Sequence, residues 1–237
     1  MRLSAPIFKL KRQARLMARG RNIPLHDALD SVAIAEGFRS WSHLASKMPT
    51  GRASDQIIAA LNAGDVVLLG GRPGQGKTLL GLEIAASASR MGRRGIFFTL
   101  EFNESDVLSH YNALGIDIGE LASPPIIDTS NDICASHIVD RLGNTANDVI
   151  AVVDYLQILD QKRSHPDLGE QVEILRAHAK KHGSIVVLIS QVDRSFELGN
   201  KRVPDLNDVR LPNPVDMNLF DKTCFVHEGK LQMADVG

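Results

Sequence analysis

The stretch Val66-Val-Leu-Leu-Gly-Gly-Arg-Pro-Gly-Gln-Gly-Lys-Thr78 decides the fold of this 237-residue chain. It opens with the apolar run Val66–Leu69, which is typical of a strand buried on both faces, and continues as G-x-x-x-x-G-K-[ST], the phosphate-binding loop motif. An apolar helical stretch follows at Leu79–Ala88. Because the motif stands in the strand–loop–helix context that it requires, we predict that the loop binds a nucleoside triphosphate.

The residue types of the loop suit phosphate binding. Its three glycines let the backbone turn so that successive N–H groups point at phosphate oxygens, and the following helix adds the positive end of its dipole. The Lys77 ammonium can reach the β- and γ-phosphates, and the Thr78 hydroxyl can ligate Mg²⁺. The predicted nucleotide-binding residues are Gly71, Arg72, Pro73, Gly74, Gln75, Gly76, Lys77 and Thr78.

The pattern around the loop predicts an α/β domain at residues 53–237. Apolar runs alternate there with helical stretches, which indicates a mainly parallel sheet covered by helices on both faces, a three-layer arrangement. A final pair of runs joined by Glu228-Gly229 is typical of a hairpin. The expected strands contain Val66–Leu69, Ile96–Leu100, Ile126–Ile127, Val149–Leu156, Ile185–Ile189, Thr223–His227 and Lys230–Met233, and the clearest helices are Lys77–Met91 and Gly169–His182.

Polar residues follow three of these strands, at the edge where open α/β sheets bind their ligands. We predict that Asp154 anchors Mg²⁺, that Glu101 orients or deprotonates the attacking water, and that Gln191 contacts the γ-phosphate or that water. Each has a simpler interpretation. The two acids can cap the segments that follow them, and the Gln191 amide can merely satisfy backbone groups at the end of its strand.

The formal net charge of −1 hides an asymmetry. Residues 1–52 contain ten Lys and Arg against three Asp and Glu, a charge of +7, so the totals of 27 and 28 leave 17 basic and 25 acidic residues, or −8, for 53–237. Helical periodicity predicts a small basic helical domain at 1–52. Its Lys11, Arg12, Arg15 and Arg19 form a ridge that can follow a phosphate backbone; a solvated face, or a surface that docks onto the acidic domain, is the alternative.

Together these motifs resemble the RecA-like P-loop ATPase core and, within it, the motor domain of DnaB-family replicative helicases, as a truncated or divergent member. The matching segments are Gly71–Thr78 (family G-x-R-P-x-x-G-K-T), Phe97–Glu101 (F-x-S-L-E), Asp154–Gln157 (D-Y-L-Q), Ser190–Glu197 (S-Q-L-N-R-x-x-E), and Lys201-Arg202 with Asp208–Arg210 (K-R-P…D-L-R). The resemblance implies that Glu101 is the catalytic base, with Lys77 and Gln191 in catalysis and Thr78 and Asp154 on Mg²⁺.

We therefore expect a Mg-dependent ATPase of the DnaB-helicase type that acts on or with DNA, with ATP and single-stranded DNA as partners and a homo-oligomer, a hexamer among the options, as its assembly. Arg194, Lys201 and Arg202 are candidates for contacts with nucleic acid or a neighbouring subunit, or are solvated loop charges. The alternative is a nucleotide-controlled regulatory or scaffold ATPase of the KaiC type without helicase activity. A small-molecule phosphotransferase is less favoured, because no acceptor-site motif follows the loop.

Location can also be inferred from composition. No apolar run approaches the roughly 18 residues of a membrane helix, and the start of the chain lacks a secretory signal core. The two cysteines, Cys134 and Cys224, make no metal-ligand pattern. We expect a cytoplasmic protein with no membrane contact.

Overall fold

The structure is a computed structural model that describes residues 4, 7–46, 52–121, 123–143, 149–160, 165–198, 201, 203–210, 213 and 215–236. The chain divides into two compact units, residues 1–52 and 53–237. The sequence Met48-Pro-Thr-Gly51 is typical of a linker, and these residues lie outside the described ones.

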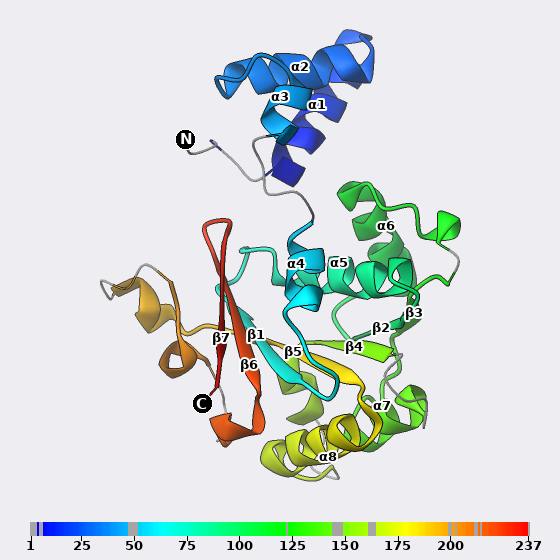
Figure 1. Ribbon diagram of the computed structural model, residues 1–237, viewed down its shortest axis with the longest axis vertical. Coiled ribbons are helices and arrows are strands. Elements are labelled where there is room, and N and C mark those ends of the chain that lie inside the picture. Colours follow the sequence, from blue (N-terminus) through cyan, green and yellow to red (C-terminus); the bar gives the residue numbers. More distant parts are fainter. Residues whose placement is uncertain are drawn as a thin grey trace. The chain divides into compact units, whose positions relative to one another are not determined.

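The larger unit is built on one seven-stranded sheet with the order β3-β2-β4-β5-β1-β6-β7. Every neighbouring pair is parallel except β6 and β7, which form the predicted antiparallel hairpin. Figure 1 shows helices on both sides of this sheet. The mainly parallel, three-layer α/β fold predicted from the sequence is confirmed. The strands are β1 (Val66–Gly71), β2 (Arg94–Thr99), β3 (Ile126–Asp128), β4 (Val149–Asp154), β5 (Ile185–Gln191), β6 (Lys222–His227) and β7 (Lys230–Asp235).

The helices of this unit fall between the strands along the chain, except α4, which precedes β1. The α-helices are α4 (Ala53–Ala59), α5 (Lys77–Arg90), α6 (Glu104–Leu114), α7 (Ala135–Leu142) and α8 (Leu168–His182). Short 3₁₀ turns complete the connections at η1 (Ile118–Glu120), η2 (Leu156–Asp160), η3 (Arg194–Leu198), η4 (Leu206–Asp208) and η5 (Met217–Leu219). The apolar run 149–156 predicts one strand, but β4 ends at Asp154 and η2 begins two residues later.

The period-two alternation of the strands divides the core between the two faces of the sheet. Val67 and Leu69 pack with α4, α5 and α6 on one face, whereas Val66 and Leu68 pack with α7 and α8 on the other. All four of these β1 side chains are fully buried, each worth about 1.5–3 kcal/mol in transfer free energy. This burial explains why β1 reads as a continuous apolar run, and it holds the phosphate loop at the centre of the sheet.

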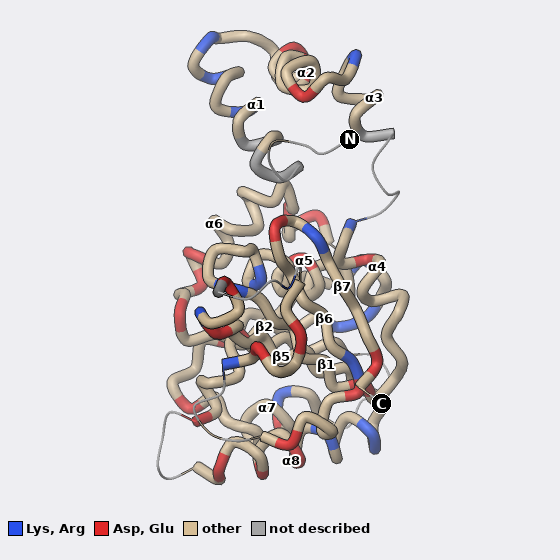
Figure 2. Tube along the Cα trace, turned by 90° about the vertical axis from the view of Figure 1, so that its left-hand side faces the viewer, with Lys and Arg blue, Asp and Glu red and all other residues tan. Residues whose placement is uncertain are grey.

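The smaller unit holds three short helices in its described part, α1 (Ile7–Arg21), α2 (Leu25–Ala35) and α3 (Trp41–Ser46). Leu10 and Ala14 of α1 pack against Ala28 and Val32 of α2, and Trp41 covers the same core. The period of three and four residues in the sequence thus corresponds to a helical interface. Figure 2 shows basic residues in the later part of α1, and Arg19 and Arg21 lie in its last turn.

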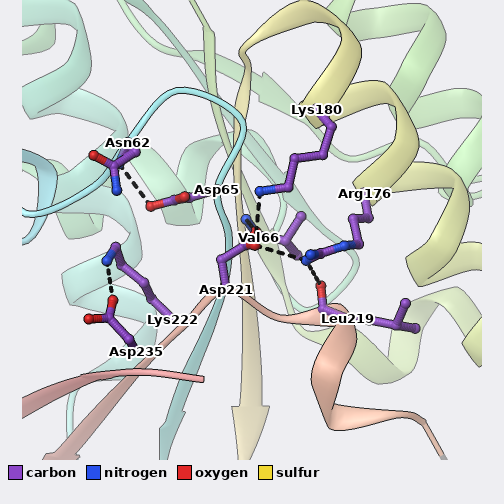
Figure 3. Close-up of polar contacts among 9 residues, drawn as sticks. All are labelled: Asn62, Asp65, Val66, Arg176, Lys180, Leu219, Asp221, Lys222 and Asp235. Carbon is purple, nitrogen blue, oxygen red and sulfur yellow. Dashed lines mark hydrogen bonds and ion pairs between the residues drawn. The ribbon is translucent and has the colours of Figure 1, made fainter. Parts of the chain in front are cut away.

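Asp221 joins three elements at the edge of the sheet opposite the phosphate loop (Figure 3). Its Oδ2 accepts a hydrogen bond from the Val66 N–H at 2.9 Å, and its Oδ1 lies 2.8 Å from Lys180 Nζ and 3.0 Å from Arg176 Nη1. Burial alone would raise the pKa of Asp221, but the hydrogen bonds from Lys180 and Val66 and the two cationic charges outweigh it and hold the pKa below its ordinary 3.8. The carboxylate therefore ties the starts of β1 and β6 to α8.

We expect Asp221→Ala to lower the free energy of unfolding by about 2 kcal/mol, because it leaves the Val66 N–H and two cations without their acceptor. Asp221→Asn keeps an acceptor for Val66 and should destabilise less. Because the folded-state pKa lies below the unfolded one, the carboxylate's contribution is complete above about pH 4 and is lost as the pH falls through the folded pKa. Urea unfolding at several pH values between 3 and 7 measures both effects.

The matched control is Glu173→Gln, which changes an exposed carboxylate on the same helix. Its effect should stay within about 0.5 kcal/mol at every pH. A constant difference between the wild type and Asp221→Asn from pH 7 to pH 3 would contradict the assigned ion pairs.

Candidate functional site

The phosphate loop connects β1 to α5, and its backbone has the geometry that the motif predicts. Gly74 and Gly76 have φ values of +76° and +89°, which residues with a Cβ rarely adopt. Gly76 is the N-cap of α5 without a side-chain hydrogen bond. Lys77 is the first residue of α5; its side chain is buried, and its ammonium donates to the Arg72 carbonyl at 3.1 Å. The loop thus presents backbone N–H groups and a helix start beside a buried cation.

The parallel sheet brings the other predicted catalytic residues to the same edge. Gly71 pairs in register with Gln191, and Thr99 pairs with Asp154. Because β4 lies between β2 and β5, and β5 lies beside β1, the carboxyl ends of these four strands are adjacent. Glu101 follows β2 by two residues, and its charge acts on both Lys77 and Asp154. Residues far apart in the sequence are therefore gathered around the loop.

Lys77 and Asp154 form the electrostatic centre of the site. Burial raises the pKa of Asp154 to about 6, helped by the charge of Glu101 and opposed by a hydrogen bond from the Thr78 hydroxyl and by the charge of Lys77. Burial also lowers the pKa of Lys77, although Asp154 and Glu101 favour its charged form. Both pKa shifts favour the uncharged form of the group. The mutual attraction of the two charges therefore does not fully compensate for their removal from water.

The oxygen atoms around Thr78 fit a magnesium ion. Asp154 Oδ2 is buried and has no hydrogen-bond partner among the described residues, and the Thr78 hydroxyl contacts the same carboxylate. Mg²⁺ prefers a few protein oxygens together with phosphate oxygens and water. One carboxylate and one hydroxyl beside a phosphate loop supply such a set.

Glu101 is exposed and lines a polar pocket of about 290 Å³ together with Asn103, Asp106 and Thr129. Its backbone N–H donates to the Thr99 hydroxyl at 3.1 Å. The helix that follows, α6, is capped by Asn103 and Asp106, which exchange side-chain-to-backbone hydrogen bonds in a capping box. Capping therefore does not engage the Glu101 carboxylate.

Two side chains of the loop itself are directed to flanking segments. The Arg72 guanidinium is 14% exposed and donates from Nε to Glu197 Oε1 at 2.8 Å and from Nη1 to the Val192 carbonyl at 3.0 Å. Gln75 Oε1 accepts from the Glu228 N–H, in the turn between β6 and β7, at 2.8 Å. The motif predicts Arg72 and Gln75 among the nucleotide-binding residues and gives no indication of these partners.

Gln157 is a site residue that the sequence indicates only as part of a motif. Its Nε2 donates to the Arg210 carbonyl at 2.9 Å and lies 3.4 Å from the Ser190 hydroxyl, and its Oε1 is buried without a partner among the described residues. Arg210 in turn donates its N–H to the Gln191 carbonyl at 2.7 Å. Gln191, which is half-buried, is thus held by its backbone at the end of β5.

The predicted basic contact residues fall into three groups. Lys11, Arg12, Arg15 and Arg19 all lie on α1, where Arg15 is half-buried and Arg19 exposed; the side chains of the first two are outside the described residues. Arg194 is exposed in η3, whereas Lys201 pairs with Asp205 at 2.8 Å and Asp208 at 3.0 Å. Arg202 is outside the described residues.

A membrane-spanning helix is not found: none of the helices in the described ranges is both long and apolar enough to cross a bilayer.

Comparison with known proteins places this site in a family. The family model "ATPase: KaiC" matches residues 53–205, which is more than half of the chain. The replicative DNA helicase DnaB of Mycoplasma genitalium is 22% identical over 208 residues, covering 73% of this chain and 44% of the helicase. That of Leifsonia xyli subsp. xyli is 25% identical over 231 residues, covering 83% and 50%. The chain therefore spans about half the length of the curated relatives it matches.

Among solved structures, a DnaB-like replicative helicase, described together with its interactions with primase, superposes with a TM-score of 0.58 at 15% identity, covering 97% of this chain and 72% of that one. This likeness supports the RecA-like fold. The resemblance to DnaB-type helicases that the motifs indicated is confirmed by the relatives. Because the family model spans the phosphate loop, all four site strands and the segment beyond Gln191, the chain belongs to the KaiC family of ATPases.

Proposed function

We propose that this chain is a Mg-dependent ATPase of the DnaB-helicase type that acts on or with DNA. The observation that carries the proposal is the arrangement of buried Lys77 and Asp154 beside a loop held at positive φ, with Glu101 within electrostatic reach of both. A phosphate loop, a buried strand-end carboxylate and a second acid nearby are the parts that ATP hydrolysis requires.

In the proposed reaction each part has one role. The N–H groups of the loop and the start of α5 hold the β- and γ-phosphates, and Lys77 exchanges the Arg72 carbonyl for phosphate oxygens. Thr78 and Asp154 hold Mg²⁺, which when bound neutralises charge on the phosphates. Glu101 orients a water and takes its proton as the water oxygen bonds to the γ-phosphorus and the bond to the bridging oxygen breaks, giving ADP and phosphate. Gln191 contacts the γ-phosphate.

Action on DNA is proposed from the relatives and from charge. The relatives named above are replicative DNA helicases, and α1 carries the basic ridge of a segment whose net charge is +7. A homo-oligomer, with a hexamer as one option, and a cytoplasmic location complete the proposal by analogy with these relatives.

The second candidate is a nucleotide-controlled switch without helicase activity, which the family model named for KaiC favours. The two candidates differ in how the ATPase responds to DNA. A helicase-type motor hydrolyses ATP faster when single-stranded DNA is bound, whereas a switch turns over slowly at the same rate with and without it.

We expect Glu101→Gln to lower kcat for ATP by about 10²–10⁴-fold, because it removes the group that accepts the proton of the attacking water. ATP affinity should change little, since Glu101 does not hold the phosphates. Phosphate-release kinetics and titration with a fluorescent ATP analogue measure the two quantities. Glu104→Gln, an exposed carboxylate three residues further along, is the matched control and should keep wild-type turnover. Comparable turnover in both variants would remove Glu101 from the mechanism.

We expect Arg15→Gln combined with Arg19→Gln to reduce the salt dependence of single-stranded DNA binding. Each lost phosphate contact should decrease the slope of log K against log salt by about 0.7. Fluorescence anisotropy at several salt concentrations measures the slope. The control neutralises two exposed lysines of the larger unit, Lys181 and Lys230, and should leave the slope as it was. A slope that responds equally to both pairs would argue against α1 as the contact surface.

A further inference from the structure

The guanidinium of Arg72 connects the phosphate loop to the segment that follows β5. Its two hydrogen bonds go to different acceptors, the Val192 carbonyl directly after Gln191 and the Glu197 carboxylate one 3₁₀ turn later. The backbone pairs the same regions, because the Val192 N–H donates to the Gly71 carbonyl at 3.1 Å. Arg72 thus contacts the segment beyond β5 with both its side chain and its neighbouring peptide.

The two ends of this segment are bound to each other. Val192 forms an antiparallel bridge with Val209, the Asp193 N–H donates to the Asp208 carbonyl at 2.7 Å, and Gln157 holds the Arg210 carbonyl. The 3₁₀ turn η3, which contains Arg194, lies between these contacts along the chain. Because these contacts fix the two ends of the segment to each other, a displacement of Val192 also displaces Asp208 and Val209.

The contacts of Lys77 show how a bound phosphate would affect Arg72. The ammonium of Lys77 now donates to the Arg72 carbonyl, and its charge opposes that of the Arg72 guanidinium. Phosphate oxygens compete for the same ammonium, because a charge-assisted hydrogen bond to an anion is stronger than one to a neutral carbonyl. Filling the loop would therefore change the partner of the Arg72 carbonyl, next to the side chain that contacts Val192 and Glu197.

We infer that Arg72 is a positioning residue that couples occupancy of the phosphate loop to the described residues 192–198 and 203–210, through the Val192 carbonyl and Glu197. The inference rests on the proposed binding of ATP. An arginine suits this role because its planar fork reaches two separate acceptors, which the single ammonium of a lysine does not. The Glu197 carboxylate is 54% exposed, so the ion pair adds little to global stability, and its effect is expected in the coupling.

The competing assignment is that the Arg72 guanidinium binds phosphate directly, as its place in the motif suggests. The two assignments predict different behaviour for Glu197→Gln. If Arg72 binds phosphate, loss of the Glu197 charge leaves ATP affinity unchanged or increases it. If Arg72 acts through the Val192 carbonyl and Glu197, that variant shows part of the defect of Arg72→Ala, and the double variant shows no defect beyond that of Arg72→Ala.

The experiment uses the full chain with Mg²⁺ and ATPγS. Amide hydrogen exchange is followed in peptides that cover 192–198 and 203–210, and a fluorescent ATP analogue reports affinity in the same samples. In the wild type we expect ATPγS to slow exchange in both peptides. Arg72→Ala, alone or combined with Glu197→Gln, should lose more than about half of this nucleotide-dependent change while still binding the analogue, and Glu197→Gln and Arg72→Lys should each lose a smaller part of it.

Asp205→Asn is the control, because it removes a partner of Lys201 within the same segment and leaves the Arg72 contacts intact. Exchange should rise with and without ATPγS, and the difference between the two should persist. If Arg72→Ala weakens analogue binding by about tenfold or more while Glu197→Gln behaves as the wild type, Arg72 is a phosphate ligand and the inference is wrong. If the wild type binds ATPγS without any change in exchange, the inference is wrong, whereas the proposed binding of ATP is unaffected. If the wild type does not bind it, the proposed function fails as well.

Discussion

A buried lysine and a buried aspartate beside the phosphate loop impose the constraint on which the rest of the site depends. Lys77 is 8% and Asp154 2% exposed, and each would lose its charge if it were buried without the other. Although they lie near each other, the pKa of Lys77 is lowered and that of Asp154 is raised, and burial is the largest cause of both shifts. In the proposed function, anionic phosphates opposite Lys77 and a cation beside Asp154 would complete the charge balance. The proposed Mg–ATP ligand, which carries both signs of charge, matches this arrangement.

Holding these charges in place requires a rigid sheet beneath them. The loop is continuous with β1, a fully buried inner strand, and α5 packs on the face of the sheet over β2 and β4. A Cβ on Gly95 would overlap the Ala85 carbonyl, so that glycine allows β2 and α5 to approach each other. At the opposite edge Asp221 fixes the starts of β1 and β6 to α8. The site can be highly charged because the strands that carry it are buried and covered by helices on both faces.

The sequence predicted what is encoded locally. The phosphate loop, the buried strands and the acids that follow them are visible in short windows, because side-chain periodicity and glycine content report directly on local backbone geometry. The limits of β4 were less well predicted. Leu156, Ile158 and Leu159 are fully buried in η2, so the apolar run continues after the strand has ended. A run of apolar residues indicates burial, but it does not distinguish a strand from a short helix.

Contacts between distant segments could not be predicted in the same way. The partners of Arg72, Gln75 and Val66 lie 125, 153 and 155 residues away along the chain, and no local pattern identifies them.

The ion pairs of the larger unit also could not be predicted from local sequence. Many basic side chains of the larger unit pair with its own acids, as in Arg141–Asp128, Arg176–Asp221, Lys180–Asp221, Lys201–Asp208 and Lys222–Asp235. With a net charge of −8, that unit repels a polyanion at long range, whereas residues 1–52 carry +7 and attract it. The net charge of −1 therefore hides two surfaces of opposite charge. In the proposed function, the acidic unit binds ATP together with Mg²⁺, and the basic unit binds the DNA backbone directly.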